Sequence, residues 1–331
     1  MKILVISGFL GAGKTTFIKA LAKHTGREFA ILENEYGSVG VDGDSLKDNI
    51  PPGKVNIWEM AEGCICCSMK GDFAASVLTI ANTVDPEYLV IEPTGVGMLS
   101  SIIQSLKEIE YERISLLAPV TIVDGYSYER YRQEFTELYR DQIAEAHTVI
   151  ISKMEQAGDQ ERALLEKKLR EWNPHARILT AHYTQMEQDW WNSLLEKGYD
   201  GQSLKCEKAG GQELPDTFSM SGVFLESPEK LFLMMERIIF GEFGDICRAK
   251  GHLKAGNQIF QFDVADGRYS VTGMEKEQAG KVVFIGRDIR RQEIRRCFYT
   301  IKNPDGASRR AKPLRVRESA AHREKIPVIT C

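Results

Sequence analysis

Glycines, a lysine and two threonines stand close together near the N-terminus, directly after an apolar run. Residues 8–16 read GFLGAGKTT and match the pattern G-x-x-x-x-G-K-[ST]. In such a loop the glycines let the backbone curl so that successive N–H groups point at phosphate oxygens, and the lysine bridges the β- and γ-phosphates. The motif therefore predicts a loop that binds a nucleoside triphosphate, through Gly8, Gly11, Ala12, Gly13, Lys14, Thr15 and Thr16.

A triphosphate bound in such a loop also needs a magnesium ion, which oxygen-bearing side chains must hold. The hydroxyl of Thr15 is one candidate ligand, and the carboxylate of Glu92, at the end of a second apolar run, is the other. Gly95 follows closely, where a backbone N–H can meet the γ-phosphate and sense its hydrolysis. We expect Lys14, Glu92 and Gly95 to be the catalytic residues. Asp124 also ends an apolar run, but no neighbouring motif marks it as a magnesium ligand as Gly95 does for Glu92.

A third polar segment, residues 152–155, reads SKME and follows another apolar run. In many GTPases this position reads N-K-x-D, and the acid accepts hydrogen bonds from N1–H and N2–H₂ of guanine. Here Ser152 replaces the asparagine, while Glu155 keeps two acceptor oxygens on a side chain one methylene longer. The stem of Lys153 can lie along the base. We favour guanine as the base, with adenine or loose selectivity as the alternative.

Three thiols, Cys64, Cys66 and Cys67, stand within four residues and precede a helix-like segment. Thiolates near a helix N-terminus have a lowered pKa and are ready metal ligands. Zn²⁺ and Co²⁺ both accept tetrahedral sulfur sites, and the fourth ligand must come from Glu35, a water molecule or a partner protein. The cluster therefore predicts a transition-metal site. The alternatives are a redox pair and a local structural metal site.

The elements that must position these residues alternate between short apolar strands and polar, helix-like segments. The strand candidates are continuous apolar runs, as in a parallel sheet buried on both faces. This alternation predicts a P-loop NTPase domain of the α/β class with a mostly parallel, doubly wound sheet, over residues 1–200. Strands are expected at 3–7, 29–33, 55–58, 88–92, 120–124, 148–152 and 178–181, and helices at 14–23, 73–84, 100–109, 133–145 and 161–172.

A second pattern follows a polar, glycine-rich linker at residues 201–216. Residues 217–300 predict a small α+β domain, and residues 301–331 form a basic tail that we expect to be flexible or to serve as an interaction arm. Strands are expected at 218–225, 246–253, 258–264 and 282–285, and helices at 228–240 and 290–298.

Composition excludes several classes of function. The formal net charge of −4 argues against a dedicated nucleic-acid binder, which needs a basic face. No apolar run approaches the roughly 20 residues needed to cross a bilayer, and no signal-peptide pattern is present. Clustered thiols fit a reducing compartment better than a disulfide framework. We expect a cytoplasmic protein without nucleic-acid or membrane partners.

Taken together, the motifs resemble those of one family, the CobW-like metallochaperone GTPases, which are relatives of HypB and UreG. The similarity covers residues 1–299 and does not extend to the tail. In the small domain it rests on residues 248–251, which read RAKG, and residues 284–287, which read FIGR. In the first domain it rests on the phosphate loop, a switch-like stretch, the thiols and the Glu92 segment, which occupy residues 8–16, 33–42, 63–67 and 92–95.

The resemblance implies a GTPase cycle that controls a metal site. Mg²⁺–GTP would order residues 33–42 and complete the site at the three thiols, and hydrolysis to GDP would loosen the metal. Zn²⁺ or Co²⁺ would then pass to a client metalloprotein, and a homodimer is compatible with this cycle. The six scattered histidines indicate delivery rather than storage. The alternatives are a nucleotide-driven activator of a corrinoid or metal enzyme, which acts by redox chemistry or remodelling, and a small-molecule kinase.

Overall fold

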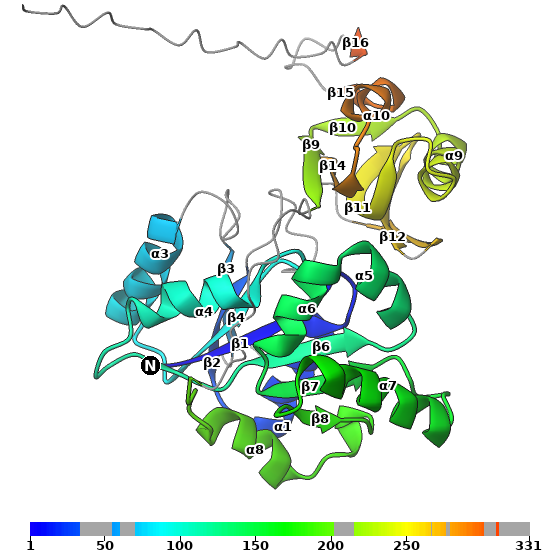
Figure 1. Ribbon diagram of the computed structural model, residues 1–331. Coiled ribbons are helices and arrows are strands. Elements are labelled where there is room, and N and C mark those ends of the chain that lie inside the picture. The colour runs from blue at the N-terminus through cyan, green and yellow to red at the C-terminus, as the bar shows by residue number, and fades with distance from the viewer. Residues whose placement is uncertain are drawn as a thin grey trace, which may run out of the picture.

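A parallel sheet forms the centre of the N-terminal part of the chain in a computed structural model (Figure 1). The structure describes residues 1–33, 55–59, 70–201, 215–265, 267–275, 279–300 and 309–310. Within them the strand order is β3-β2-β4-β1-β6-β7-β8, with β5 paired to β1, and every pairing is parallel. The strands are β1 (Lys2–Gly8), β2 (Phe29–Glu33), β3 (Val55–Glu59), β4 (Tyr88–Glu92), β5 (Ser115–Leu116), β6 (Val120–Asp124), β7 (Thr148–Ser152) and β8 (Arg177–Leu179).

Helices cover both faces of this sheet because its strands are apolar on both sides. In β1, Leu4 and Ile6 pack with α1 and α8, whereas Ile3 and Val5 pack with α3 and α4 on the opposite face. None of the helices in the described ranges is long and apolar enough to span a bilayer. The helices of this part are α1 (Lys14–Thr25), α3 (Lys70–Thr83), α4 (Leu99–Lys107), α5 (Tyr128–Glu134), α6 (Thr136–Ala144), α7 (Asp159–Trp172) and α8 (Gln188–Glu196), with the 3₁₀ turn η1 (Tyr183–Gln185).

Two features of the helices differ from expectation. The single helix expected over 133–145 is divided at Phe135, whose backbone is non-helical (φ −129°, ψ 43°). Phe135 is buried, and its ring lies 4.9 Å from that of Phe9, so a tertiary contact outweighs local helix propensity. Helix α8 was not expected. It buries Trp190 and Trp191 against α1.

A second sheet forms the C-terminal part and is antiparallel except where β10 meets β11. The strand expected at 218–225 is divided by Gly222, which has a φ of 66°. Strand β13 was not expected because its side chains are mostly exposed and polar. The elements are β9 (Asp216–Ser221), β10 (Val223–Leu225), α9 (Pro228–Ile239), β11 (Asp245–Ala255), β12 (Gln258–Ala265), β13 (Arg268–Met274), β14 (Lys281–Arg287), α10 (Arg291–Cys297), β15 (Tyr299–Thr300) and β16 (Arg309–Arg310).

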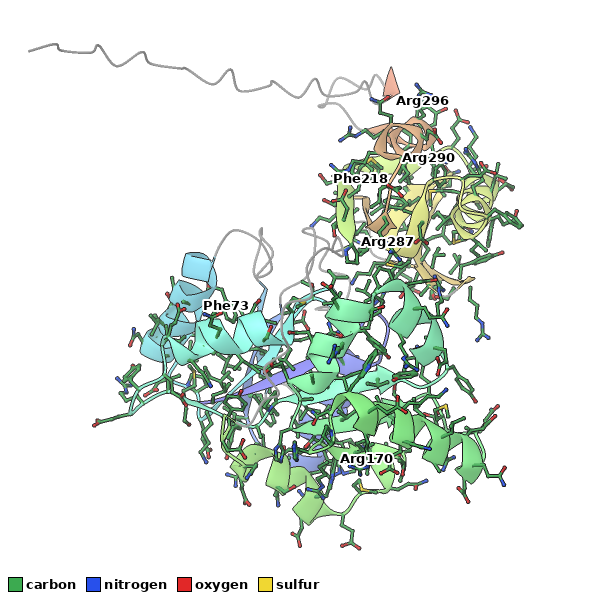
Figure 2. All side chains as sticks on the ribbon, in the orientation of Figure 1. Phe73, Arg170, Phe218, Arg287, Arg290 and Arg296 are labelled. Atoms are coloured by element: carbon green, nitrogen blue, oxygen red, sulfur yellow. The ribbon has the colours of Figure 1, made fainter. Side chains whose placement is uncertain are left out.

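The two faces of the C-terminal sheet have different partners. One face packs under α9, where Ala249 and Phe284 share a core with Met235. Val283 and Ile285 point to the opposite side of β14, and both belong to the core of the N-terminal part. Figure 2 shows Arg287, the last residue of β14, on the side of the C-terminal sheet that faces α5 and α6. Its guanidinium lies 4.7 Å from the ring centroid of Phe135 in the N-terminal part. Packed side chains therefore join the two sheets.

This junction makes a prediction about Cys247, which belongs to the same shared core. Its thiol donates to the carbonyl oxygen of Ile285 at 3.1 Å, and burial raises its pKa to about 12. The thiolate fraction at pH 8 should therefore be on the order of a thousandfold smaller than for an ordinary thiol. We expect iodoacetamide to leave Cys247 unmodified in the folded chain, as followed by peptide mass spectrometry.

Cys297 is the internal control because it is only partly buried, and it should react first. Both thiols should react readily in urea. Alkylation of Cys247 as fast as Cys297 in the folded chain would contradict the packing of the two sheets.

Candidate functional site

The loop between β1 and α1 has a positive φ at three glycines, Gly8, Gly11 and Gly13, a backbone that only glycine adopts easily. Gly8 has a φ of 143°, and a Cβ there would lie 2.3 Å from the carbonyl oxygen of Ile122. Gly13 has a φ of 101° and caps α1 without any side chain over the helix end. The first N–H groups of a helix have no intrahelical partner and attract anions. The loop is therefore shaped to receive a phosphate.

Lys14 places a positive charge at the centre of this loop. Its side chain is 7% exposed, and its Nζ donates to the carbonyl oxygens of Gly8 at 3.0 Å and Phe9 at 3.2 Å. Burial of an ammonium group is costly unless hydrogen bonds or an opposite charge offset it. The loop carbonyls supply part of that compensation, and a bound anion would supply more.

Oxygen ligands lie directly beside this lysine. The hydroxyl of Thr15 donates to Glu92, at 3.0 Å from Oε1 and 3.1 Å from Oε2. Glu33 is in register with Glu92 across β2 and β4, and with Glu59 across β2 and β3. Three glutamates thus end three neighbouring parallel strands. A hydroxyl in contact with a carboxylate is the hard oxygen set that suits Mg²⁺, so the residues present fit that ion.

The segment after β4 rests directly on the phosphate loop. A Cβ on Gly95 would lie 2.5 Å from the backbone nitrogen of Leu10, so only a glycine allows this approach. Gln142, which is fully buried on α6, holds the segment in place. Its Nε2 donates to the carbonyl oxygens of Gly95 at 3.1 Å and Gly97 at 3.0 Å. Nothing in the sequence distinguished this glutamine from a solvent-exposed helix residue.

The end of β7 is tied to the same loop. Ser152 Oγ donates to the carbonyl oxygen of Ala12 at 2.7 Å and to that of Val123 at 3.2 Å. Lys153 Nζ lies 2.7 Å from Asp124 Oδ2, and Asp124 is 3% exposed. The serine therefore fastens the segment after β7 to the phosphate loop, and Asp124 anchors the neighbouring lysine.

Glu155 borders a small cavity beside this segment, together with Met154, Arg162 and His182. Glu155 Oε1 lies 3.3 Å from His182 Nε2. His182 Nδ1 accepts from the backbone N–H of Thr184 at 3.4 Å, which favours the tautomer with its proton on Nε2, on the side of Glu155. No pattern in the sequence pointed to His182. Ile151 and Met154 give this cavity an apolar side, and Glu155 is its one carboxylate.

The structure thus brings together most of the residues expected from the sequence. The phosphate loop, Glu92 with Gly95, and the segment 152–155 all lie at the carboxyl ends of β1, β4 and β7, where ligands bind in sheets of this kind. The part of the chain described here holds no group of three His, Cys, Asp or Glu side chains that could bind a metal. The predicted metal ligands Cys64, Cys66, Cys67 and Glu35 lie outside the described residues.

Comparison with known proteins identifies relatives of this chain. The zinc chaperone YjiA of Escherichia coli (strain K12) is 30% identical over 186 residues, which are 54% of this chain and 56% of YjiA. The zinc chaperone YeiR of the same organism is 33% identical over 166 residues, 49% of each chain. The crystal structure of Zn(II)-bound YjiA GTPase from E. coli has 20% identity and a TM-score of 0.43, and the match covers 90% of this chain and 97% of that one.

The chain therefore spans about half the length of the curated relatives it matches. Residues 221–301 match the family described as cobalamin synthesis protein cobW C-terminal domain. Residues 2–180, more than half of the chain, match the family described as CobW/HypB/UreG, nucleotide-binding domain. By that match the chain is a member of the CobW/HypB/UreG family.

Proposed function

We propose that this chain is a GTP-hydrolysing metallochaperone, which couples a Mg²⁺–GTP cycle to the binding of a transition metal and its delivery to a client metalloprotein. The observation that best supports this proposal is the contact of Thr15 with Glu92 beside the buried Lys14. This arrangement joins a phosphate loop to a magnesium-type oxygen set. Zinc is the favoured cargo because the relatives YjiA and YeiR are named zinc chaperones, and cobalt is the alternative.

Different residues of the chain have different roles in hydrolysis. Lys14 and the N-terminal amides of α1 hold the phosphates, and Thr15 and Glu92 hold the magnesium ion. When bound, that ion neutralises charge on the β- and γ-phosphate oxygens. The N–H of Gly95 would meet the γ-phosphate. Water attacks the γ-phosphorus, the bond to the β-phosphate oxygen breaks, and GDP and phosphate leave.

Metal control follows from the order of elements along the chain. Cys64, Cys66 and Cys67 fall between β3, which ends at Glu59, and α3, which begins at Lys70. Strand β3 pairs with β2, and β2 pairs with β4, whose last residue is Glu92. The thiol segment is therefore attached to the strands that carry the nucleotide-side acids. In this proposal a change at the γ-phosphate reaches the thiols through these strands.

The proposal predicts that the nucleotide changes zinc affinity. Zinc bound at the thiols should be held roughly 5- to 150-fold more tightly with Mg²⁺ and a non-hydrolysable GTP analogue than with GDP, the usual range of coupling between two sites. Competition titration with a chromophoric chelator measures this ratio. The variant Cys66→Ala should abolish it. Equal zinc affinity in both nucleotide states would sink the proposal, and a disulfide among the thiols without bound metal would favour a redox role.

The magnesium site makes a separate prediction. Glu92→Gln keeps the shape of the side chain but removes its charge, so kcat for GTP should fall on the order of 100-fold and the dependence on Mg²⁺ should weaken. Steady-state hydrolysis across a magnesium series measures both effects. The matched control is Glu87→Gln, which removes an exposed carboxylate just before the same strand. Equal kcat in the two variants would refute the role of Glu92.

Base selection can be tested at Glu155. Loss of a carboxylate that pairs with two guanine donors should cost about 1–3 kcal/mol of discrimination. Glu155→Ala should therefore reduce the preference for GTP over ATP by roughly 10- to 100-fold, whereas Glu155→Asp should retain it because the carboxylate remains. Equilibrium binding of both nucleotides gives the preference. A wild-type chain that binds ATP as tightly as GTP would show that Glu155 does not select guanine.

A further inference from the structure

One face of the C-terminal sheet presents a row of basic side chains to the nucleotide-binding part. Arg248, Lys250 and His252 occupy alternate positions of β11 and so share a face. In the register of the sheet, Arg248 pairs with Ile285 and Lys250 pairs with Val283. The row therefore lies on the face of the sheet to which Val283 and Ile285 belong.

That face shares a buried core with the phosphate loop. Val283 and Ile285 share one buried core with Phe9 and Leu10, the two residues that follow the first glycine of the loop. Lys250 is beside Val283 and only 7% exposed. The lysine is thus enclosed at the junction of the two sheets, next to the loop expected to hold the phosphates.

The charges around Lys250 come from both parts of the chain. From β12, Asp263 faces it in register, and Asp263 also binds Arg248 with an N–O distance of 2.7 Å. From the N-terminal part, the charges of Glu33 and Lys14 act on it. Burial lowers the pKa of Lys250 to about 8, Asp263 and Glu33 oppose that shift, and Lys14 adds to it. On its own strand, His252 is turned to the carbonyl oxygen of Ala279 at 3.0 Å.

The position of Glu33 indicates which end of a nucleotide Lys250 would meet. In the sheet order, β2 with Glu33 lies on one side of β1, and β7 with the cavity at Glu155 lies on the other. A base at Glu155 therefore directs the terminal phosphate past Lys14 toward Glu33. A second ammonium on that side suits the added negative charge of a triphosphate.

We propose that Lys250 is a residue of the nucleotide site, whose ammonium group is supplied by the C-terminal sheet and binds the terminal phosphate end of the triphosphate together with Lys14. The inference rests on the proposed binding of GTP. It identifies Lys250 as the group that distinguishes bound GTP from bound GDP. The two sheets would close more tightly on the triphosphate than on the diphosphate. The C-terminal part would thereby sense whether the γ-phosphate is present.

Binding of a non-hydrolysable GTP analogue and of GDP to the full chain, both with Mg²⁺, tests the inference. Lys250→Met should weaken the triphosphate analogue roughly 10- to 100-fold, as expected for a lost hydrogen bond to a charged group, and leave GDP within about 2-fold. Lys250→Arg should retain most of the preference because its charge remains. Lys254→Met is the matched control, since it removes an exposed lysine four residues along the same face of β11.

A Lys250→Met chain with unchanged preference for the triphosphate would overturn the inference. Equal weakening of both ligands would also overturn it, since Lys250 would then only hold the sheets together. Protection of Cys247 from iodoacetamide reports whether the junction is intact in each variant. If Lys250→Met does not fold, Lys250→Gln takes its place with the same expected loss. A wild-type chain that binds no guanine nucleotide would refute the proposed function itself, whereas a loss confined to the variants leaves that function standing.

Discussion

The rest of the structure depends on the burial of one positive charge in the loop between β1 and α1. The ammonium of Lys14 is 7% exposed, and loop carbonyls and the N-terminal end of α1 surround it. Such a site is stable with a backbone curled by Gly8 and Gly13, and it attracts an anion. The oxygen set at Thr15 and Glu92 lies beside it because adjacent parallel strands end at the same edge of the sheet.

Phe9, in the phosphate loop, belongs to a buried core that contains residues of both the N-terminal and the C-terminal parts of the chain. Its ring lies 4.2 Å from that of Tyr131 and 4.9 Å from that of Phe135, at the break between α5 and α6. The same core contains Val283 and Ile285 of the C-terminal sheet. Close-packed interiors transmit displacement because they cannot deform gradually. A loop that shifts when it binds phosphate would therefore move the junction as well.

The sequence was most informative where one local property sufficed. Strands such as β6 and β7 were predictable from continuous apolar runs, and the phosphate loop from the spacing of its glycines and lysine. The break at Phe135 was not, because the Phe9 ring that contacts it is distant in sequence. Gln142 and His182 were missed for the same reason, since their partners come from other elements. Pattern alone also missed β13, whose side chains bury little apolar surface.

We infer that residues outside the phosphate loop respond to the presence of the γ-phosphate. Hydrogen–deuterium exchange of the full chain, compared between Mg²⁺ with a non-hydrolysable GTP analogue and Mg²⁺ with GDP, tests this most directly. We expect added protection with the triphosphate in residues 94–97, which rest on the loop, and in β14 of the C-terminal sheet. Added protection confined to residues 8–16 would contradict it.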